Sequence, residues 1–419
     1  MPDPAPRPAG RLRTALVHIP FRRFLIVRFL TALAVQMQTV AIGAQLYAMT
    51  HRPLDLGLVG LSQILPFLLL VLPAGHVADR RDRRTVLALC ICVQLACALA
   101  LLWFTFAGIT VAWPIFAIMM AFGAARAFAS PAQGALMPNL VPPEALGSAI
   151  GVNSSAWQIA TIAGPACGGI LYSAAGPAAT YGTAAALFVL ALTLITRVAR
   201  PAQPRAREEV TLGRLLEGLR FIVNRRVILG AASLDLFAVL LGGATALMPA
   251  YAADVLKVGP AGLGWLRAAP GIGAAFTGAW LTYRPLAGKV GFWMFGGVAL
   301  YGLMTIVFGL SRSFGLSMVV LAVLGSGDMI SIYVRHMLVQ LETPDAMRGR
   351  VGAASAMFIG ASNELGEFES GLTAAWFGLI PSVVIGGILT LAVAALWARW
   401  FPALFRMDRF PPLRGAGDL

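Results

Sequence analysis

Five carboxylates lie in stretches of this sequence that are otherwise apolar, and three of them fall within one short segment, NELGEFESG, residues 363–371. A charged side chain near the middle of a membrane helix costs about 2.5–3.5 kcal/mol on insertion scales, so function is the default explanation for it. Such acids must be hydrated, paired or protonated. Closely spaced carboxylates in a poorly hydrated site take up protons more readily than carboxylates in water. The five acids are Asp235, Asp328, Glu364, Glu367 and Glu369.

Glu364 and Glu367 are three residues apart and share one face of a helix, whereas Glu369 points about 160° away from Glu367. We therefore expect Glu364 and Glu367 to face an internal cavity, where one of them releases its proton as a solute binds. The alternative is that the two acids hold a positively charged cargo. Glu369 is expected to pack against another span or to approach the outer surface.

Asp328 and Arg335 are seven residues apart, about 10.5 Å along a helix axis, on nearly the same face. This separation is too long for a tight pair, so each is expected to have another partner. Asp235 lies only about eight residues from the start of its apolar run. It is explained equally well as a buried functional acid or as a cap near the cytoplasmic rim.

Two further arginines, Arg28 and Arg126, also lie in apolar runs. Arg126, in FGAARAFAS, is expected either to influence the proton affinity of a carboxylate or to bind an anionic substrate. The candidates for proton coupling or cargo binding are therefore Arg28, Arg126, Asp235, Asp328, Arg335, Glu364 and Glu367.

The elements that hold these residues are predicted to be membrane helices. Hydrophobic residues make up 58 % of the 419 residues and charged residues only 12 %, against about 25 % in soluble domains, and the mean hydropathy is +0.79. An all-α membrane protein of about twelve transmembrane helices is expected, since a span needs about 20 apolar residues. The predicted spans are 24–49, 56–78, 85–107, 112–138, 147–171, 178–197, 227–252, 260–283, 290–310, 314–340, 351–375 and 379–401.

The distribution of basic residues predicts the orientation. With the N-terminus in the cytoplasm, 25 of the 32 Lys and Arg fall in inner segments, three in outer loops and four within spans. This asymmetry is the positive-inside pattern of a multi-pass protein of the cell (inner) membrane with both termini cytoplasmic. It accounts for the net charge of +14 without a nucleic-acid partner.

The hydrophilic segment 198–226 divides the chain into two six-helix halves, 24–197 and 227–401, flanked by cytoplasmic tails 1–23 and 402–419. Within this linker, TLGRLLEGLRFIV places leucines on one face and predicts an amphipathic helix. That helix is expected either at the membrane interface or packed on the bundle as a plain linker. PPEALGSAIG at 142–151 and TPDAMRGRVG at 343–352 form an internal repeat before the fifth span of each half, which is typical of transporters.

GHVADRRDRR, between the second and third spans, resembles a motif of the major facilitator superfamily. Gly75, Asp79, Arg80, Arg83 and Arg84 match the family pattern, while Asp82 replaces its second glycine. The resemblance implies a transporter whose two six-helix halves alternate access to a central site. It also implies that Asp79 helps to latch the cytoplasmic side, through an arginine or a helix N-terminus.

AGPACGGIL in the fifth span resembles the antiporter motif of proton-coupled exporters and favours export over import. Its residues are Gly151, Gly164, Pro165, Gly168 and Gly169, with Ala160 where another glycine is usual. FGAARAFAS resembles the exporter motif that carries an intramembrane arginine, with Ala129 and Ser130 in place of Gln-Gly.

Longer strings such as SLDLFAVLLGGATALMPAYAADVL resemble the enterobactin-exporter-like branch, the transmembrane secretion effectors. That resemblance implies a monomeric, proton-coupled exporter of a small amphiphilic siderophore or drug, with protons and the lipid bilayer as its other partners. An importer or lipid flippase of the same fold is the alternative, and a non-transporting membrane sensor is a more distant one.

No enzymatic activity, cofactor or metal site is expected. The sequence contains no G-x-S-x-G or H-E-x-x-H motif, and its four histidines are scattered. Cys90, Cys92, Cys97 and Cys167 lie in apolar runs without a C-x-x-C pair, so we expect small packing residues rather than disulfides or metal ligands.

Overall fold

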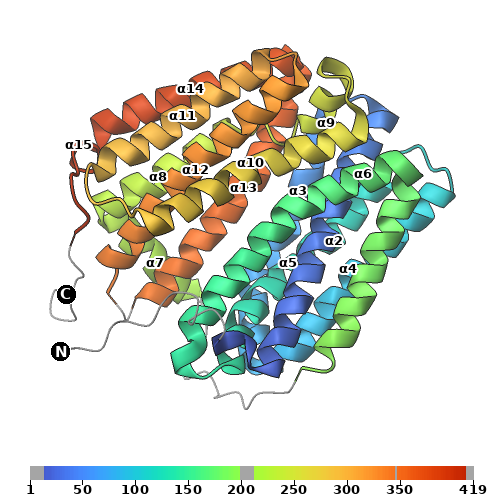
Figure 1. The fold of residues 1–419 in the computed structure, drawn as a ribbon, viewed down its shortest axis with the longest axis horizontal. Coiled ribbons are helices and arrows are strands. Elements are labelled where there is room, and N and C mark those ends of the chain that lie inside the picture. Colours follow the sequence, from blue (N-terminus) through green and yellow to red (C-terminus); the bar gives the residue numbers. More distant parts are fainter. Residues whose placement is uncertain (1–13, 199–211, 345–346, 412–419) are drawn as a thin grey trace. The chain divides into compact units, whose positions relative to one another are not determined.

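The computed structural model describes residues 14–198, 212–344 and 347–411, and over these residues its regular structure is entirely helical (Figure 1). The chain forms two compact units. One comprises Met1–Gln45 with Leu65–Val210, and the other Leu46–Ile64 with Thr211–Leu419. The end of the first long helix and the start of the second therefore belong to the second unit, although the sequence places them in the first predicted half.

The first six predicted spans correspond to five long helices. These are α2 (Ile19–Thr50), α3 (Pro53–Arg80), α4 (Arg83–Phe106), α5 (Trp113–Leu136) and α6 (Leu146–Ile195), with two short 3-10 turns, η1 (Met137–Leu140) and η2 (Pro143–Ala145), between the last two. α6 contains both the fifth and the sixth span, because the chain turns at Gly176, whose φ of 78° is one that favours glycine. The break between predicted spans 147–171 and 178–197 lies at this residue.

The remaining elements begin with the linker helix α7 and end with a short C-terminal helix. They are α7 (Leu212–Asn224), α8 (Arg226–Leu241), α9 (Met248–Ala250), the π-helical turn η3 (Tyr251–Val255), α10 (Gly259–Tyr283), α11 (Val290–Leu310), α12 (Phe314–Glu342), α13 (Arg348–Phe377), α14 (Leu379–Trp400) and α15 (Pro402–Phe405). Each of the twelve predicted spans therefore has a helical counterpart.

Eight helices in the described part of the chain are long and apolar enough to cross a membrane by length and composition alone. α8 is only 16 residues long, α10 is rich in glycine and alanine, and α13 carries the three acids of NELGEFESG. α8 is shorter than a full span because the helix breaks after Leu241, and the acids lower the hydropathy of α13.

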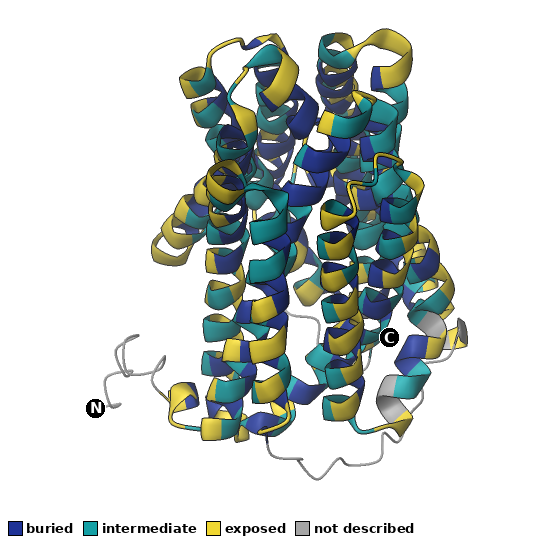
Figure 2. Ribbon diagram, turned by 90° about the vertical axis from the view of Figure 1, so that its right-hand side faces the viewer, coloured by how far each residue is buried: buried dark blue, intermediate teal, exposed yellow. Residues whose placement is uncertain are grey.

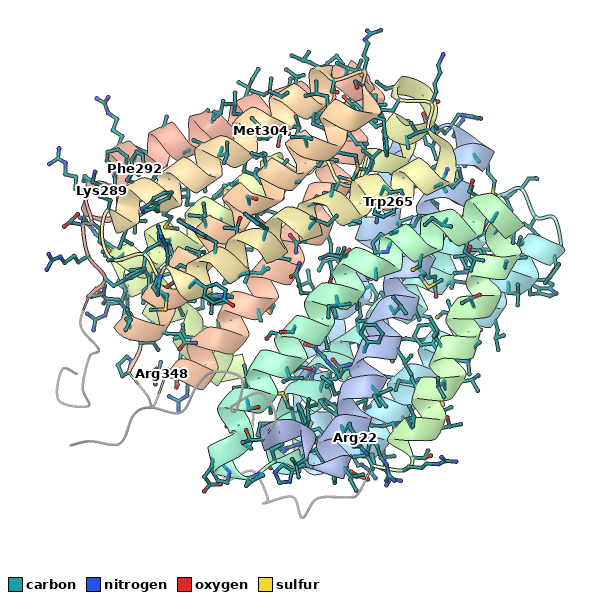
Figure 3. The ribbon with its side chains drawn as sticks, in the orientation of Figure 1. Arg22, Trp265, Lys289, Phe292, Met304 and Arg348 are labelled. Atoms are coloured by element: carbon teal, nitrogen blue, oxygen red, sulfur yellow. The ribbon has the colours of Figure 1, made fainter. Side chains whose placement is uncertain are left out.

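Side chains on the helix surfaces suit a lipid environment. Buried residues line the faces between helices, while large apolar residues lie on the outside (Figure 2). Some exposed tryptophans, for example Trp113 and Trp400, lie at helix ends, as in the aromatic belts of membrane proteins. In Figure 3, Arg22, Lys289 and Arg348 likewise lie at helix ends, and Met304 lies within α11. These features identify an integral membrane protein.

The seventh span is not one continuous helix, contrary to the prediction of a span over 227–252. α8 ends at Leu241, residues 242–247 leave the helical conformation, and helical structure resumes at Met248. The consecutive glycines Gly242 and Gly243 have low helix propensity, and Pro249 lies in the first turn of the helix that follows, where proline is tolerated. Non-helical backbone at membrane depth is tolerated only where protein or water satisfies its polar groups.

The predicted amphipathic linker helix is present as α7, and it packs on the start of α13. Ile222 is buried in a cluster with Ile228, Val351 and Ala354, and Arg350 forms an ion pair of 2.9 Å with Glu217. The packing favours the linker-helix alternative over a purely interfacial one.

Candidate functional site

A buried ion pair joins α8 to α12. Arg335 Nη1 donates a hydrogen bond to Asp235 Oδ2, and the two side chains are only 7 % and 6 % exposed. Asp235 is therefore a buried, paired acid rather than a cap at the cytoplasmic rim. Removing one partner of such a pair leaves the charge of the other buried without its direct partner. The folded protein therefore needs both side chains or neither.

Asp328 and Asp235 line the same small pocket, which lies between α8, α11 and α12. Its lining residues are Asp235, Ala238, Val239, Val298, Tyr301, Asp328 and Ser331. Ser331 is 2 % exposed, and within the described residues its Oγ has no hydrogen-bond partner. Two carboxylates and one guanidinium thus leave one negative charge in this pocket when both acids are ionised.

The same pocket is connected to the break in the seventh span. Tyr301, from the pocket wall, donates a hydrogen bond from its hydroxyl to the Gly242 carbonyl at 3.2 Å. The Thr390 hydroxyl donates to the carbonyl of Ala238, one turn earlier in α8, at 3.3 Å. Side chains of α11 and α14 thus satisfy backbone carbonyls at the end of α8.

The acids of α13 lie against the first part of α3, which belongs to the same compact unit. Glu364 is 8 % exposed, and Glu367 is partly buried. A Cβ added at Gly60 would lie 3.0 Å from both the Glu364 carbonyl and the Glu367 carboxylate. These two acids therefore occupy a tight crossing of helices. Glu369, on another face, is also partly buried.

Arg267 of α10 was missed as a site residue by the sequence reasoning. Its guanidinium interacts electrostatically with Glu367, and its Nε is buried without a hydrogen-bond partner in the described part of the chain. Arg267 is the single charged residue in the predicted span 260–283. Because a charge inside a membrane span is costly, this position alone indicates a candidate site residue.

A second missed contact joins α2 to the π-helical turn. The Tyr47 hydroxyl donates a hydrogen bond to Asp254 Oδ2, and the Tyr47 ring packs edge-on against His51 with centroids 5.7 Å apart. Asp254 lies at the end of an apolar run, where the sequence alone gives no indication of a tyrosine more than 200 residues away.

The arginines of the first unit have aromatic neighbours. Arg28 donates a hydrogen bond to Gln133 Oε1 of α5, and its guanidinium lies 5.7 Å from the centroid of the Trp157 ring of α6. Arg126 lies 5.8 Å from the Phe67 ring. Each arrangement is within the range of a cation–π interaction.

The loop motif between α3 and α4 has a clear local structure where it is described. Asp82, which replaces the family's second glycine, is the N-cap of α4, and its carboxylate accepts hydrogen bonds from Arg84 N at 3.1 Å and Thr85 Oγ1 at 2.8 Å. Arg83 and Arg84 donate to the carbonyls of Ala135 and Val198. The Asp79 side chain lies outside the described residues, so the latch contact predicted for it stays a prediction.

The antiporter-like motif places glycines where α6 crosses α2. A Cβ added at Gly168 would lie 2.7 Å from Met37 Cα, and one at Gly164 would lie 2.5 Å from Gln36 Cβ. Pro165 and Gly169 are buried beside them, whereas a Cβ at Gly151 would meet open space. Gly164 and Gly168 therefore allow the close approach of two helices.

Among the described residues, no cluster of three or more His, Cys, Asp or Glu side chains could hold a metal ion, and the four cysteines are free thiols. The arrangement can bind and release protons, pair with charged cargo and change helix contacts.

Comparison with known proteins identifies the family of the chain. The model of the transmembrane secretion effector family matches residues 14–409. An enterobactin exporter EntS of Escherichia coli O1:K1 is 30 % identical over 397 residues, covering 90 % of this chain and 93 % of the relative.

Two solved structures share the fold at low identity. A bacterial homologue of the human lysosomal transporter Spinster, inward-facing and occupied, has a TM-score of 0.75 at 13 % identity and covers 94 % of this chain and 98 % of its own. A D-xylose–proton symporter has a TM-score of 0.71 at 15 % identity and covers 91 % and 98 %, respectively. The chain thus belongs to the transmembrane secretion effector family of major facilitator transporters.

Proposed function

We propose that this transporter is a proton-driven exporter that moves a small amphiphilic molecule out of the cell by alternating access. The observation that carries the proposal is the pocket of α8, α11 and α12, where Asp235, Asp328 and Arg335 leave one negative charge in a buried site. An uncompensated charge of this kind is costly, and a proton on Asp328 removes it.

The proposed coupling step uses contacts of this pocket. When Asp328 loses its proton, Arg335 is drawn toward a second carboxylate and its hold on Asp235 weakens. The Asp235 side chain is on α8, whose last carbonyls are held by Tyr301 and Thr390. Loss of the proton is thereby transmitted to the break in the seventh span, the element we propose to move between the two access states.

Export, rather than import, is supported by the name of a relative and by one motif. The 30 % identical relative is an enterobactin exporter, and Gly164, Pro165, Gly168 and Gly169 follow the antiporter pattern. We infer that the cargo is a siderophore or a drug-like molecule. The excess of basic residues in the predicted inner segments supports an inner-membrane location with both termini in the cytoplasm. We infer that one chain is sufficient for the transport cycle.

The α13 acids form a second set of coupling candidates. Glu367 interacts with Arg267 and lies in a tight helix crossing with Gly60. α3 and α13 can separate here only if the carboxylates become hydrated, bind cargo or take up protons. Protonation of Glu364 or Glu367 would therefore favour the separation of these two helices.

Purified protein in liposomes tests the coupling proposal. Liposomes with an acidic lumen, in which the cytoplasmic face of the protein points outward, should take up a fluorescent amphiphilic dye such as Hoechst 33342. The uptake is counted above that of protein-free liposomes with the same pH difference. Asp328→Asn should abolish this pH-driven accumulation and leave downhill movement of the dye. Glu144→Gln, which removes an exposed acid outside the pocket, is the matched control and should behave as wild type. Full pH-driven accumulation by Asp328→Asn would rule out Asp328 as the coupling residue.

A further inference from the structure

The break in the seventh span borders a second small cavity of the same compact unit. This cavity lies between the end of α8, α13 and α14, and it shares no lining residue with the pocket of Asp235 and Asp328. Its lining residues are Leu241, Gly242, Gly243, Ala244, Leu247, Ser370, Ser382, Val383 and Gly386. None of these side chains is ionisable, so the polar groups of the cavity are backbone groups and two serine hydroxyls.

The end of α8 presents an unpaired carbonyl to this cavity. The last carbonyls of a helix have no intrahelical partner and carry a partial negative charge. The Ala238 carbonyl accepts from Gly242 N at 2.9 Å and from the Thr390 hydroxyl, whereas within the described residues no hydrogen bond reaches the carbonyl of Leu241. The Leu241 oxygen faces α14, since a Cβ added at Gly386 would lie 2.5 Å from it. An acceptor left unpaired inside a protein is costly.

The backbone donors of the break do not satisfy this carbonyl. The N–H groups of Gly242, Ala244 and Leu247 donate at 2.9, 2.7 and 3.2 Å to carbonyls of the same segment, two to four residues earlier. The break therefore closes on itself through its donors and leaves an acceptor facing the cavity.

The two serines also present acceptors. Ser370 and Ser382 are each 5 % exposed, and a Cβ added at Gly243 would lie 2.7 Å from Ser370 Oγ, which places this hydroxyl against the break. The Ser370 hydroxyl interacts with the Glu369 carboxylate, and the Ser382 hydroxyl lies 2.7 Å from Thr373 Oγ1 and 3.3 Å from the Ser370 carbonyl. Because an ionised carboxylate and a carbonyl only accept, each serine uses its proton there and keeps oxygen lone pairs.

Glu369 supplies a negative charge next to the cavity. It takes no part in the proposed coupling step, it is partly buried, and among the described residues no basic side chain forms an ion pair with it. A cavity of acceptors beside one carboxylate suits a cation with a single charge, whereas Ca²⁺ prefers six to eight oxygens with several carboxylates. The free space is smaller than one water molecule needs, which suits a bare sodium ion better than the larger potassium ion.

We propose that a sodium ion binds in this cavity, held by the Leu241 carbonyl and the hydroxyl oxygens of Ser370 and Ser382. Glu369 balances its charge through Ser370. In transporters with discontinuous helices, unwound carbonyls and helix C-terminal ends coordinate such ions. The ion links the end of α8 to α13 and α14, and its site does not include Asp328, so it stands apart from the proposed proton coupling.

Binding of radiolabelled sodium to the full-length protein in nanodiscs tests this proposal without any ion gradient. Sodium should bind saturably, and NaCl should displace it at a much lower concentration than KCl, while N-methyl-D-glucamine chloride should not displace it. Ser382→Ala should lower the affinity about tenfold or more, and Glu369→Gln should do the same because it acts on a ligand through a hydrogen bond. Ser317→Ala, at a buried serine of α12 outside the cavity, is the matched control and should bind sodium as wild type does.

Thermal unfolding separates loss of the ion from loss of the fold. NaCl should raise the midpoint of the wild type above its value in KCl of equal concentration, because an ion that binds the folded state stabilises it. Ser382→Ala should match the wild type in KCl and lack the gain in NaCl.

Three results would overturn the proposal. They are no saturable sodium binding, equal displacement by NaCl and N-methyl-D-glucamine chloride, or sodium binding that Asp328→Asn abolishes and Ser382→Ala leaves intact. The last result would place the ion in the other pocket. Saturable sodium binding without pH-driven dye uptake would refute proton coupling and leave the sodium site standing, and Asp328-dependent uptake without sodium binding would do the reverse.

Discussion

The two six-helix halves of the sequence differ in the charges that their apolar segments contain. The first six spans contain Arg28 and Arg126, whereas the last six contain five acids with Arg267 and Arg335. The contacts differ as well, because Arg28 has neutral partners, while Arg335 is paired with Asp235 and Arg267 interacts with Glu367.

This difference teaches that intramembrane arginines in one chain can have opposite energetic roles. In a buried ion pair, removing either side chain leaves the charge of the other buried without its direct partner, which destabilises the folded protein. An arginine whose neighbours are an amide and a ring can be removed without leaving an opposite charge buried and unpaired. The following substitutions separate the two roles.

The largest effect is expected for Asp235→Ala, which removes the carboxylate in direct contact with the buried Arg335 guanidinium and leaves only the more distant Asp328 in the pocket. Breaking a buried pair in this way costs about 3–5 kcal/mol. The substitution should therefore lower the free energy of unfolding by that amount, measured as a large drop in the midpoint of thermal unfolding in detergent, followed by tryptophan fluorescence.

The control is the double variant Asp235→Ala with Arg335→Met, which removes both charges and keeps the long side chain of α12. It should recover most of the lost thermal stability while remaining inactive in pH-driven transport. A double variant as unstable as Asp235→Ala alone would mean that packing at Asp235, and not the pair, stabilises the second unit.

Arg28→Gln should have a much smaller effect on stability than Asp235→Ala. It removes one hydrogen bond to a neutral amide and one cation–π contact, together worth about 1–2 kcal/mol, and it strands no opposite charge. The same thermal measurement should show a shift well below that of Asp235→Ala. If Arg28→Gln destabilised the protein as strongly, Arg28 would have a structural partner of its own, and the contrast between the halves would fail.

The helices and their order could be predicted from the sequence because apolar runs of about 20 residues have few alternatives in a membrane. Gly176 followed by Pro177 was visible as the end of a span. The break after Leu241 was not, since GGATALM is as apolar as an unbroken helix. Local composition does not distinguish close helix packing from unwinding at a pair of glycines.

The candidate acids were also visible, but their partners were not. The spacing of Asp328 and Arg335 correctly indicated that Arg335 must have another partner, yet the choice of Asp235 depends on how α8 packs on α12 across 100 residues of sequence. Glu364 and Glu367 share a helix face, as helical geometry requires, but only the packing of α3 on α13 shows that Gly60 lies against that face. Contacts between helices follow from packing that a single sequence does not encode locally.

The smallest effect is expected for Glu217→Gln, at the ion pair that joins α7 to α13. The Arg350 and Glu217 side chains are 29 % and 55 % exposed, and solvent screening limits such pairs to about 0–1 kcal/mol. Thermal stability should therefore change little, and the change should vanish at high salt. Ile222→Ala is the matched comparison, because Ile222 is 3 % exposed in the same α7–α13 contact, and large-to-small substitutions at buried sites cost about 2–5 kcal/mol. A larger loss from Glu217→Gln than from Ile222→Ala would show that charge, rather than apolar packing, holds the linker helix on the bundle.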